Sequence, residues 1–125
     1  MKLGTDLVEV DRIAVKIGKE KGFREFVFSP GEIEYCESRT HKFEHYAARF
    51  AAKEAFFKAL GTGWVSGTAF NEVEIVHDAK GKPELKLSGE TADTLEPMGI
   101  RSILVSLTHV ASMASAVVII ETTSL

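Results

Sequence analysis

The sequence predicts an α+β fold in which a mainly antiparallel sheet packs on one long central helix. Two observations lead to this prediction. The segment Phe43–Leu60 is dense in Ala, Phe, Lys and Glu and has no Gly or Pro, which is typical of a long helix. The other patterned segments are short and are separated by turn residues, as strands in hairpins are. No repeat or linker interrupts the 125 residues, so we expect a single domain over residues 1–125.

The N-terminal part alternates between strand and helix signals. Lys2–Val10 is rich in Val, Leu and Thr and predicts a strand. Asp11 is a suitable N-cap for a helix that stops near Gly22. Ser29–Glu32 combines a serine cap, a proline at the first helical position and the glutamate of a capping box, so we expect a second helix to about Arg39.

The second half of the chain predicts four strands and one short helix. A strictly alternating strand, a turn at Asp78–Pro83 and a returning strand form a hairpin, and a helix capped by Ser88 follows. Two apolar strands end the chain, joined by a loop that begins at His109. The ranges are Glu72–Ile75, Glu84–Leu87, 88–98 for the helix, Ser102–Thr108 and Met113–Glu121.

Composition limits the compartment and the partners. No apolar run reaches the length of a membrane span, and the early Asp6 does not fit a secretory signal. Cys36 is the only cysteine, so no intrachain disulfide can form, and we expect a cytoplasmic protein. Carboxylates on both sides of Cys36 disfavour a reactive thiolate and favour a buried helix cysteine. The net charge of −3 argues against general nucleic-acid binding.

Basic residues gather near the N-terminus, at Arg12, Lys16, Lys19, Lys21 and Arg24. Such a cluster is either a solvated helix face or a docking face for an acidic partner. Charge alone does not choose between the two.

Two carboxylates stand out because their neighbours are apolar. On the long helix, Glu54 falls on the same stripe as Phe50 and Phe57, so it must be paired or bind a metal. Lys58, one turn on, offers an i,i+4 ion pair as the alternative to a metal. Asp6 lies in an otherwise apolar strand, where it either caps a loop or serves as a ligand, and Gly4 on the same strand face leaves space beside it.

One glutamate and one aspartate are a reasonable protein share of a Mg²⁺ site whose other ligands are water and substrate phosphate. Gly61-Thr62-Gly63 follows a helix rather than preceding one, so it is a helix end and not a P-loop, although it permits close backbone approach of a ligand.

Three motifs, in this order, carry a family resemblance. Gly4-Thr5-Asp6-Leu7-Val8-Glu9-Val10-Asp11-Arg12-Ile13 resembles the first signature of the holo-acyl-carrier-protein synthases, and Arg49–Gly63 resembles their second signature almost without change. Ser106-Leu107-Thr108-His109 is similar to their C-terminal element, and the capped turn at Phe28–Glu32 also fits. The resemblance spans essentially the whole chain.

The resemblance implies the 4'-phosphopantetheinyl transferase fold and specific roles for residues. Asp6 and Glu54 would hold a divalent metal, normally Mg²⁺, that also contacts the pyrophosphate of coenzyme A, and Lys58 would sit beside the phosphates. Further coenzyme A contacts would come from Arg49, Lys53, Gly61, Thr62, Gly63, Thr108 and His109.

The implied reaction moves phosphopantetheine from coenzyme A to a serine of an acyl carrier protein and supports fatty acid biosynthesis. The serine hydroxyl attacks the β-phosphate, with Glu54 or a metal-bound water as the general base and Lys58 neutralising charge. The resemblance also implies a homotrimer with sites at subunit interfaces, and a carrier docked on Arg12, Lys16, Lys19 and Arg24. Relatives often have a basic residue where this chain has Phe26, which bears on the choice of carrier.

Two alternatives remain open from the sequence. A non-catalytic module that binds coenzyme A would have lost the metal pair, yet Asp6, Glu54 and Lys58 are all present. A transferase that serves a polyketide or peptide carrier would keep the same residues, and only assays on several carriers separate it from the fatty-acid type.

Overall fold

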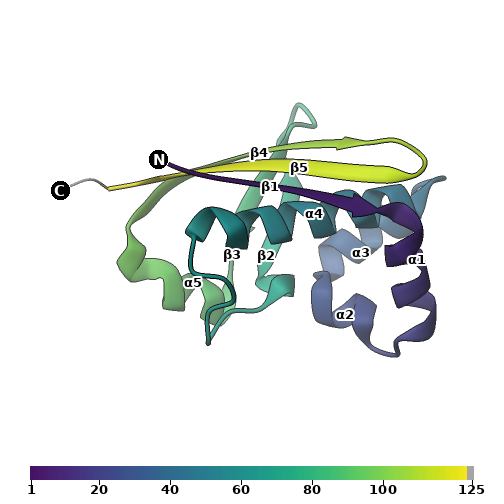
Figure 1. The fold of residues 1–125 in the computed structure, drawn as a ribbon, viewed down its shortest axis with the longest axis horizontal. Helices are drawn as coiled ribbons and strands as arrows, with labels where there is room; N and C mark the ends of the chain where they lie inside the picture. Colours follow the sequence, from purple (N-terminus) through teal and green to yellow (C-terminus); the bar gives the residue numbers. More distant parts are fainter. Residues whose placement is uncertain (124–125) are drawn as a thin grey trace.

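The computed structural model describes residues 1–123 (Figure 1). Its elements follow one another as β1 (Lys2–Glu9), α1 (Val10–Lys19), α2 (Phe23–Val27), α3 (Pro30–Glu37), α4 (Lys42–Leu60), β2 (Val73–His77), β3 (Pro83–Leu87), α5 (Gly89–Leu95), β4 (Ile100–His109) and β5 (Met113–Thr122). Short 3-10 helices at Phe70–Glu72 and Glu96–Met98 precede β2 and β4.

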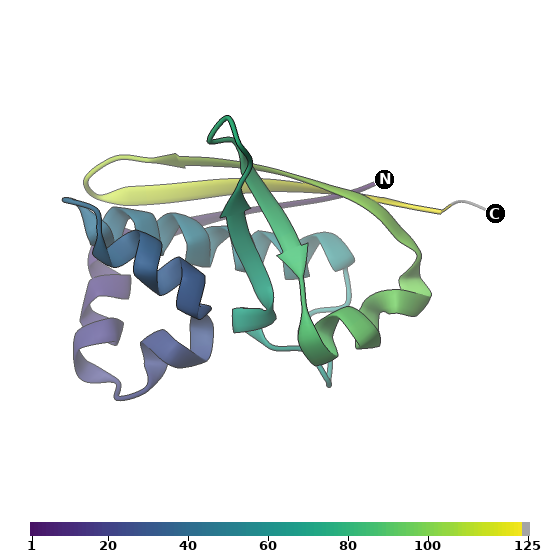
Figure 2. The ribbon, with the colours of Figure 1, turned by 180° about the vertical axis from the view of Figure 1, so that it is seen from behind.

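The predicted fold class is confirmed. Strands β1, β5 and β4 form an antiparallel sheet in that order, and β2 and β3 form a separate antiparallel hairpin. Helix α4 runs along one face of the three-stranded sheet, and the β2–β3 hairpin crosses the other side of the helix (Figure 2). The long helix is therefore the centre of the molecule.

Burial along α4 is wider than the predicted single stripe. Every residue from Tyr46 to Leu60 is buried except Glu54, which is half-buried, and Lys58, which is exposed. Layers on both sides of the helix enclose it, and these two charged side chains, one turn apart, mark the face that stays open.

Strand β1 packs on α4 through Gly4. A Cβ at this position would lie 2.0 Å from the carbonyl oxygen of Ala55 and 2.6 Å from the backbone nitrogen of Ala59. The space that we expected beside Asp6 is therefore filled by the helix backbone. Because side chains alternate along a strand, this contact turns Asp6, two residues on, toward the same helix.

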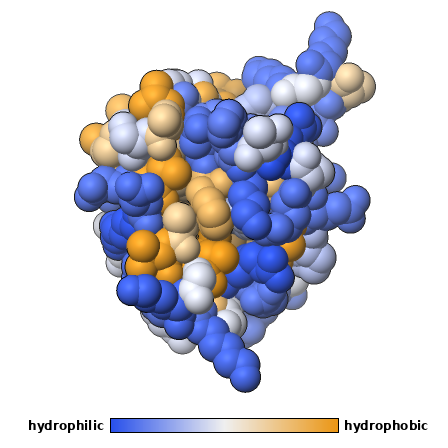
Figure 3. Space-filling view, turned by 90° about the vertical axis from the view of Figure 1, so that its right-hand side faces the viewer, coloured by the Kyte–Doolittle hydropathy of each residue, from blue (hydrophilic) through white to orange (hydrophobic). Residues whose placement is uncertain are grey.

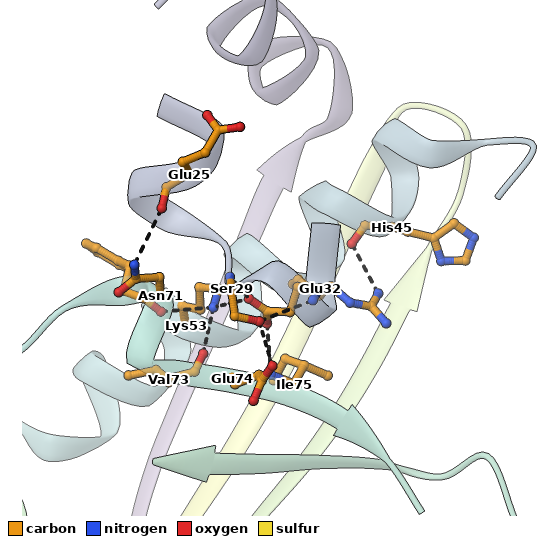
Figure 4. Close-up of polar contacts among 11 residues, drawn as sticks. Glu25, Ser29, Glu32, His45, Lys53, Asn71, Val73, Glu74 and Ile75 are labelled. Carbon is orange, nitrogen blue, oxygen red and sulfur yellow. Dashed lines mark hydrogen bonds and ion pairs between the residues drawn. The ribbon is translucent and has the colours of Figure 1, made fainter. Parts of the chain in front are cut away.

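A buried ion pair joins α4 to α3 and β2 (Figure 4). Lys53 Nζ donates to Glu32 Oε1 at 2.7 Å and to the carbonyl oxygens of Phe70 and Val73 at 2.9 and 2.6 Å. The other Glu32 oxygen accepts the Ile75 N–H at 2.8 Å, and the predicted capping box with Ser29 is present. Both charged groups are fully enclosed, so the pair depends on these hydrogen bonds.

Three local predictions differ from the structure, and one short helix was not predicted. Helix α1 begins at Val10, so Asp11 lies in its first turn, and the five-residue α2 had no clear sequence signal. Glu72, rather than Ser88, accepts hydrogen bonds from the N-terminal backbone of α5. His109 is the last residue of β4 and not part of a loop.

Within residues 1–123, no layer covers the outer face of the three-stranded sheet (Figure 1). Leu3, Leu7, Val117 and Leu104 all point outward there, and Leu3 and Leu7 are each 64% exposed. Cross-strand pairing places Leu3, Ile119 and Leu104 side by side. This is a contiguous apolar row of the kind that marks an interaction surface.

Within residues 1–123, no helix has the length and hydrophobicity that crossing a membrane requires.

Candidate active site

Asp6, Glu54 and Lys58 meet where β1 crosses the C-terminal half of α4. Lys58 Nζ donates to Asp6 Oδ1 at 2.8 Å. Within residues 1–123, Glu54 has no side-chain hydrogen bond or ion pair. The i,i+4 ion pair between Glu54 and Lys58, which the sequence offered as the alternative to a metal, is therefore not formed. The lysine bonds the strand carboxylate and leaves the helix carboxylate unpartnered.

This group of three residues has two carboxylates and one ammonium group, so negative charge is in excess. Burial, and then the negative charge of Asp6, raise the pKa of Glu54, while Lys58 and Arg12 act in the opposite direction. The hydrogen bond to Asp6 raises the pKa of Lys58. A further cation beside Glu54 would remove the repulsion between the two carboxylates.

Two separate cavities have Glu54 as a lining residue. A groove of about 500 Å³ is lined by α2 and the preceding turn, with Phe23, Phe26, Phe50 and Phe70 as its apolar walls. A smaller cavity of about 140 Å³ is lined by Phe57, Lys58, Gly63, Trp64 and again Phe70. Glu54 and Phe70 line both cavities, so Glu54 stands between two approaches.

The structure does not bring Lys53 into this group. Its ammonium is enclosed and has three protein acceptors, as described above, which uses all of its donors. A role in binding a phosphate would require breaking the buried ion pair with Glu32.

Arg49 and His109 belong to a second cationic group, at the other end of α4. The guanidinium groups of Arg39 and Arg49 lie on the Tyr35 ring, each at 4.2 Å from its centroid. The His109 ring packs edge-on against His45, and its Nδ1 is 2.8 Å from Glu44 Oε1. Burial, and then the positive charges of His109 and both arginines, lower the pKa of His45.

This second group contains residues that the sequence analysis missed: Tyr35, Arg39, His45 and His77. They come from α3, the loop after it, α4 and β2, so no spacing along the chain could have grouped them. Arg49 Nε is buried without a hydrogen-bond acceptor, which indicates that this group can take an anion.

The two groups cannot meet on one small ligand within a single chain. Glu44 is in the first turn of α4 and Lys58 in the last, and at about 1.5 Å per residue these turns are about 20 Å apart. Arg49 and Lys58 also project from opposite faces of the helix, since each residue turns the helix by about 100°. Thr108 directly precedes His109 on β4, so its side chain lies on the opposite face of the sheet from that of His109.

Comparison with known proteins decides the family. The chain matches the 4'-phosphopantetheinyl transferase superfamily over residues 2–107. It is 50% identical over 124 residues to the holo-[acyl-carrier-protein] synthase of Ruminiclostridium cellulolyticum, with 97% of this chain and 92% of that protein covered. The chain belongs to the 4'-phosphopantetheinyl transferase superfamily.

Solved structures of this superfamily have the same fold. The holo-[acyl-carrier-protein] synthase of Neisseria meningitidis aligns with a TM-score of 0.85 at 33% identity, covering 96% of this chain and 97% of that one. The ACPS–CoA complex of Chronobacterium ammoniagenes aligns with a TM-score of 0.86 at 30% identity, covering 98% of each chain. The second of these structures holds coenzyme A.

The donor set of this superfamily member suits magnesium. Residues 1–123 contain no group of three or more His, Cys, Asp or Glu side chains placed to enclose a metal ion. Asp6 and Glu54 supply two carboxylates only, which matches Mg²⁺, because this ion keeps several waters and takes substrate phosphates as further ligands. The unpartnered Glu54 is the observation that favours such an ion.

Some basic residues near the N-terminus make ion pairs with neighbouring carboxylates, and others do not. Lys16 pairs with Glu20 at 3.3 Å, and Arg24 is held by Glu25 and Glu37 at 2.8 and 3.3 Å. Arg12 and Lys19 are exposed, and within residues 1–123 neither makes an ion pair. Lys21 is also exposed and makes no ion pair within residues 1–123, so the positive charge that an incoming partner meets comes mostly from these three residues.

The end of the molecule that carries α1 is apolar at its centre and hydrophilic at its rim (Figure 3). A groove of about 320 Å³ opens there between α1, the start of α4 and the β4–β5 turn, with Val10, Ala14, Phe43 and Ala111 as apolar walls. Apolar surface thus lies beside the exposed charges of α1.

Proposed function

We propose that this chain is a holo-acyl-carrier-protein synthase, which transfers 4'-phosphopantetheine from coenzyme A to a serine of an apo acyl carrier protein in fatty acid biosynthesis. The observation that carries the proposal is the assembly of Asp6, Glu54 and Lys58 in a chain that is 50% identical to a holo-[acyl-carrier-protein] synthase. A non-catalytic coenzyme A binder would have no reason to keep a half-buried carboxylate without a partner.

In this reaction the serine oxygen forms a bond to the β-phosphorus, and the bond from that phosphorus to the leaving oxygen of adenosine 3',5'-bisphosphate breaks. Lys58, exposed and close to Glu54, donates to phosphate oxygens and offsets their growing charge. Glu54, whose pKa is raised, is placed to accept the hydroxyl proton. Mg²⁺ held by Asp6 and Glu54 would supply Lewis-acid polarisation of the phosphates.

The proposed coenzyme A site is completed by a second copy of the chain. In coenzyme A, only a ribose separates the 3'-phosphate from the pyrophosphate, whereas Arg49 and His109 lie far from Lys58 in the same chain. We therefore propose that Arg49, Thr108 and His109 of a neighbouring copy hold the 3'-phosphate. The bare apolar row of Leu3, Ile119 and Leu104 supports assembly, and a homotrimer is the arrangement implied by the family resemblance.

The carrier protein would dock on α1 and α2. Arg12 and Lys19 attract an acidic partner, with Lys16 and Arg24 adding charge once their acidic neighbours rearrange. The groove lined by Phe23 and Phe26 has Glu54 in its wall, so a serine presented there can reach this carboxylate. Gly63 lines the smaller cavity beside Glu54, and Gly61 and Thr62 directly precede it in the proposed coenzyme A loop. A buried Cys36 suits a reducing cytoplasm.

Intact-mass spectrometry of an apo acyl carrier protein tests the proposal. With this protein, coenzyme A and Mg²⁺, the carrier should gain one phosphopantetheine group, and chelation of the metal should prevent the gain. A set of fatty-acid, polyketide and peptide carriers identifies the preferred acceptor. If coenzyme A binds but none of these carriers is modified, the chain is a binding module and not a transferase.

A further inference from the structure

Trp64 has no role in the function proposed so far. It is the only tryptophan of the chain, and 64% of its surface is exposed. An exposed aromatic side chain needs no explanation by itself. Its position does, because it forms one wall of the 140 Å³ cavity whose other walls include Glu54 and Lys58.

The C-terminal end of the loop that carries Trp64 is tied to α5 by two side-chain hydrogen bonds. Thr94 Oγ1 donates to the Gly67 carbonyl oxygen at 3.0 Å, and the Ala69 N–H donates to Thr91 Oγ1 at 2.8 Å, so α5 holds the far end. At Gly63 the backbone has a φ of 68°, and a Cβ there would meet no atom within 4 Å. The space on the Cβ side of Gly63 is therefore open, and the exposed indole beside it is accessible to a ligand.

The two cavities that adjoin Glu54 offer separate positions for the two substrates. In phosphoryl transfer the attacking and leaving oxygens lie roughly in line, on opposite sides of the phosphorus. The groove lined by Phe26 adjoins the cationic carrier-docking surface, so the serine arrives from that side of Glu54. The leaving adenosine bisphosphate then occupies the other side, where Lys58 and Trp64 are.

We propose that Trp64 stacks on the adenine of coenzyme A and so positions the leaving nucleotide beside Lys58. This inference rests on the proposed function and adds a residue to its donor site. An indole next to a lysine suits a nucleotide, because the ring stacks on the base while the ammonium pairs with phosphate. The phosphopantetheine part extends toward Glu54 and away from the indole.

Fluorescence of the single tryptophan tests the contact directly. Coenzyme A and adenosine 3',5'-bisphosphate should quench Trp64 to the same final level, while 4'-phosphopantetheine should leave its emission unchanged. Quenching by 4'-phosphopantetheine alone would place the arm on the indole instead. Binding of either nucleotide, measured by calorimetry, without any change in fluorescence would also overturn the proposal.

Variants separate stacking from a general effect on the loop. Trp64→Ala should raise the Kd for adenosine 3',5'-bisphosphate by about tenfold or more, the scale of base–aromatic stacking, and Trp64→Phe should restore most of the affinity. Phe26→Ala, which removes an exposed aromatic on the other side of Glu54, should leave this Kd unchanged. Equal affinities in wild type and Trp64→Ala would refute the contact.

The same assays keep the two proposals apart. Phosphopantetheine transfer with an unresponsive Trp64 would disprove the stacking contact and leave the enzyme activity standing. Nucleotide quenching of Trp64 without transfer to any carrier would disprove the activity and leave the contact.

Discussion

Lys58 Nζ lies 2.8 Å from Asp6 Oδ1, across 52 residues of sequence, and this contact ties the end of the central helix to the first strand. Its consequence is that Glu54, one turn earlier, has no ion-pair partner within residues 1–123. The three residues thus form a site with one fixed cation and two carboxylates, and the remaining negative charge is available to a metal ion.

Glu54→Gln should lower the transfer activity and raise the thermal stability of the protein. Burial and Asp6 raise the Glu54 pKa, so this group stabilises the fold most below its ordinary pKa, and that contribution is lost as the pH rises through the raised value. At pH 7 without metal the variant should therefore melt a few degrees above wild type, and the difference should vanish near pH 4. Transfer to the carrier should fall by about 100-fold or more.

Thermal melting with and without Mg²⁺, together with the carrier mass assay, measures both effects. Glu96→Gln, at an exposed site, is the matched control and should change neither. Full activity of Glu54→Gln at low Mg²⁺ would disprove the metal role of this residue.

The sequence was sufficient to predict α4, the β2–β3 hairpin and the position of β1, because their local patterns agree with their tertiary setting. It also pointed to Asp6 and Glu54, since a carboxylate among apolar neighbours needs a reason. What it could not predict is which partner each charge has. Lys58 reaches Asp6 instead of Glu54, a pairing that depends on how closely β1 crosses the helix.

Lys53 illustrates the same limit from the other direction. Lys53 belongs to the second family signature, Arg49–Gly63, and the resemblance implies that it contacts coenzyme A. In the structure its three acceptors come from α3 and from the backbone near β2, at distances in sequence that no local pattern encodes.

Gly4→Ala should weaken the contact of β1 with α4. Its methyl group would overlap the backbone at Ala55 and Ala59, so we expect a loss of about 1–3 kcal/mol or more in the free energy of unfolding. Gly18→Ala is the matched control, because a Cβ there meets no atom within 4 Å, and in α1 it should add about 0.5–1 kcal/mol. Urea unfolding measures both, and equal effects would show that close packing at Gly4 is not required.

Lys53→Met should destabilise the protein by about 3–5 kcal/mol, because Glu32 would stay buried without its cation. Adding Glu32→Gln should recover part of this loss, since the buried charge is then removed. Lys16→Met, which breaks an exposed pair, should cost less than about 1 kcal/mol. If Lys53→Met and Lys16→Met were equally stable in urea, the buried pair would not matter to the fold.

Reversing Arg12 and Lys19 to glutamate should weaken carrier binding and leave coenzyme A binding nearly unchanged. Both residues are exposed on the proposed docking surface, and rim charges act mainly on association. We expect the carrier KM to rise about tenfold at low salt and the effect to shrink as salt increases. Titration calorimetry with each substrate provides the measurement. An equal loss of affinity for both would show that α1 is not a selective docking surface.

Mixing two inactive variants tests whether the site is shared between copies. Glu54→Gln removes a metal ligand, and Arg49→Ala removes a proposed 3'-phosphate contact about 14 Å along the helix from Lys58, at about 1.5 Å per residue. If neighbouring copies complete the site, co-refolded mixtures contain some sites with both residues intact, and activity should return to a quarter or so of wild type. Each variant refolded alone is the control. Recovery requires assembly, so Leu7→Asp on the bare sheet face should abolish it, and the mixture should then sediment as monomers. Absence of recovery in a mixture that does assemble would place both groups at separate sites of one chain.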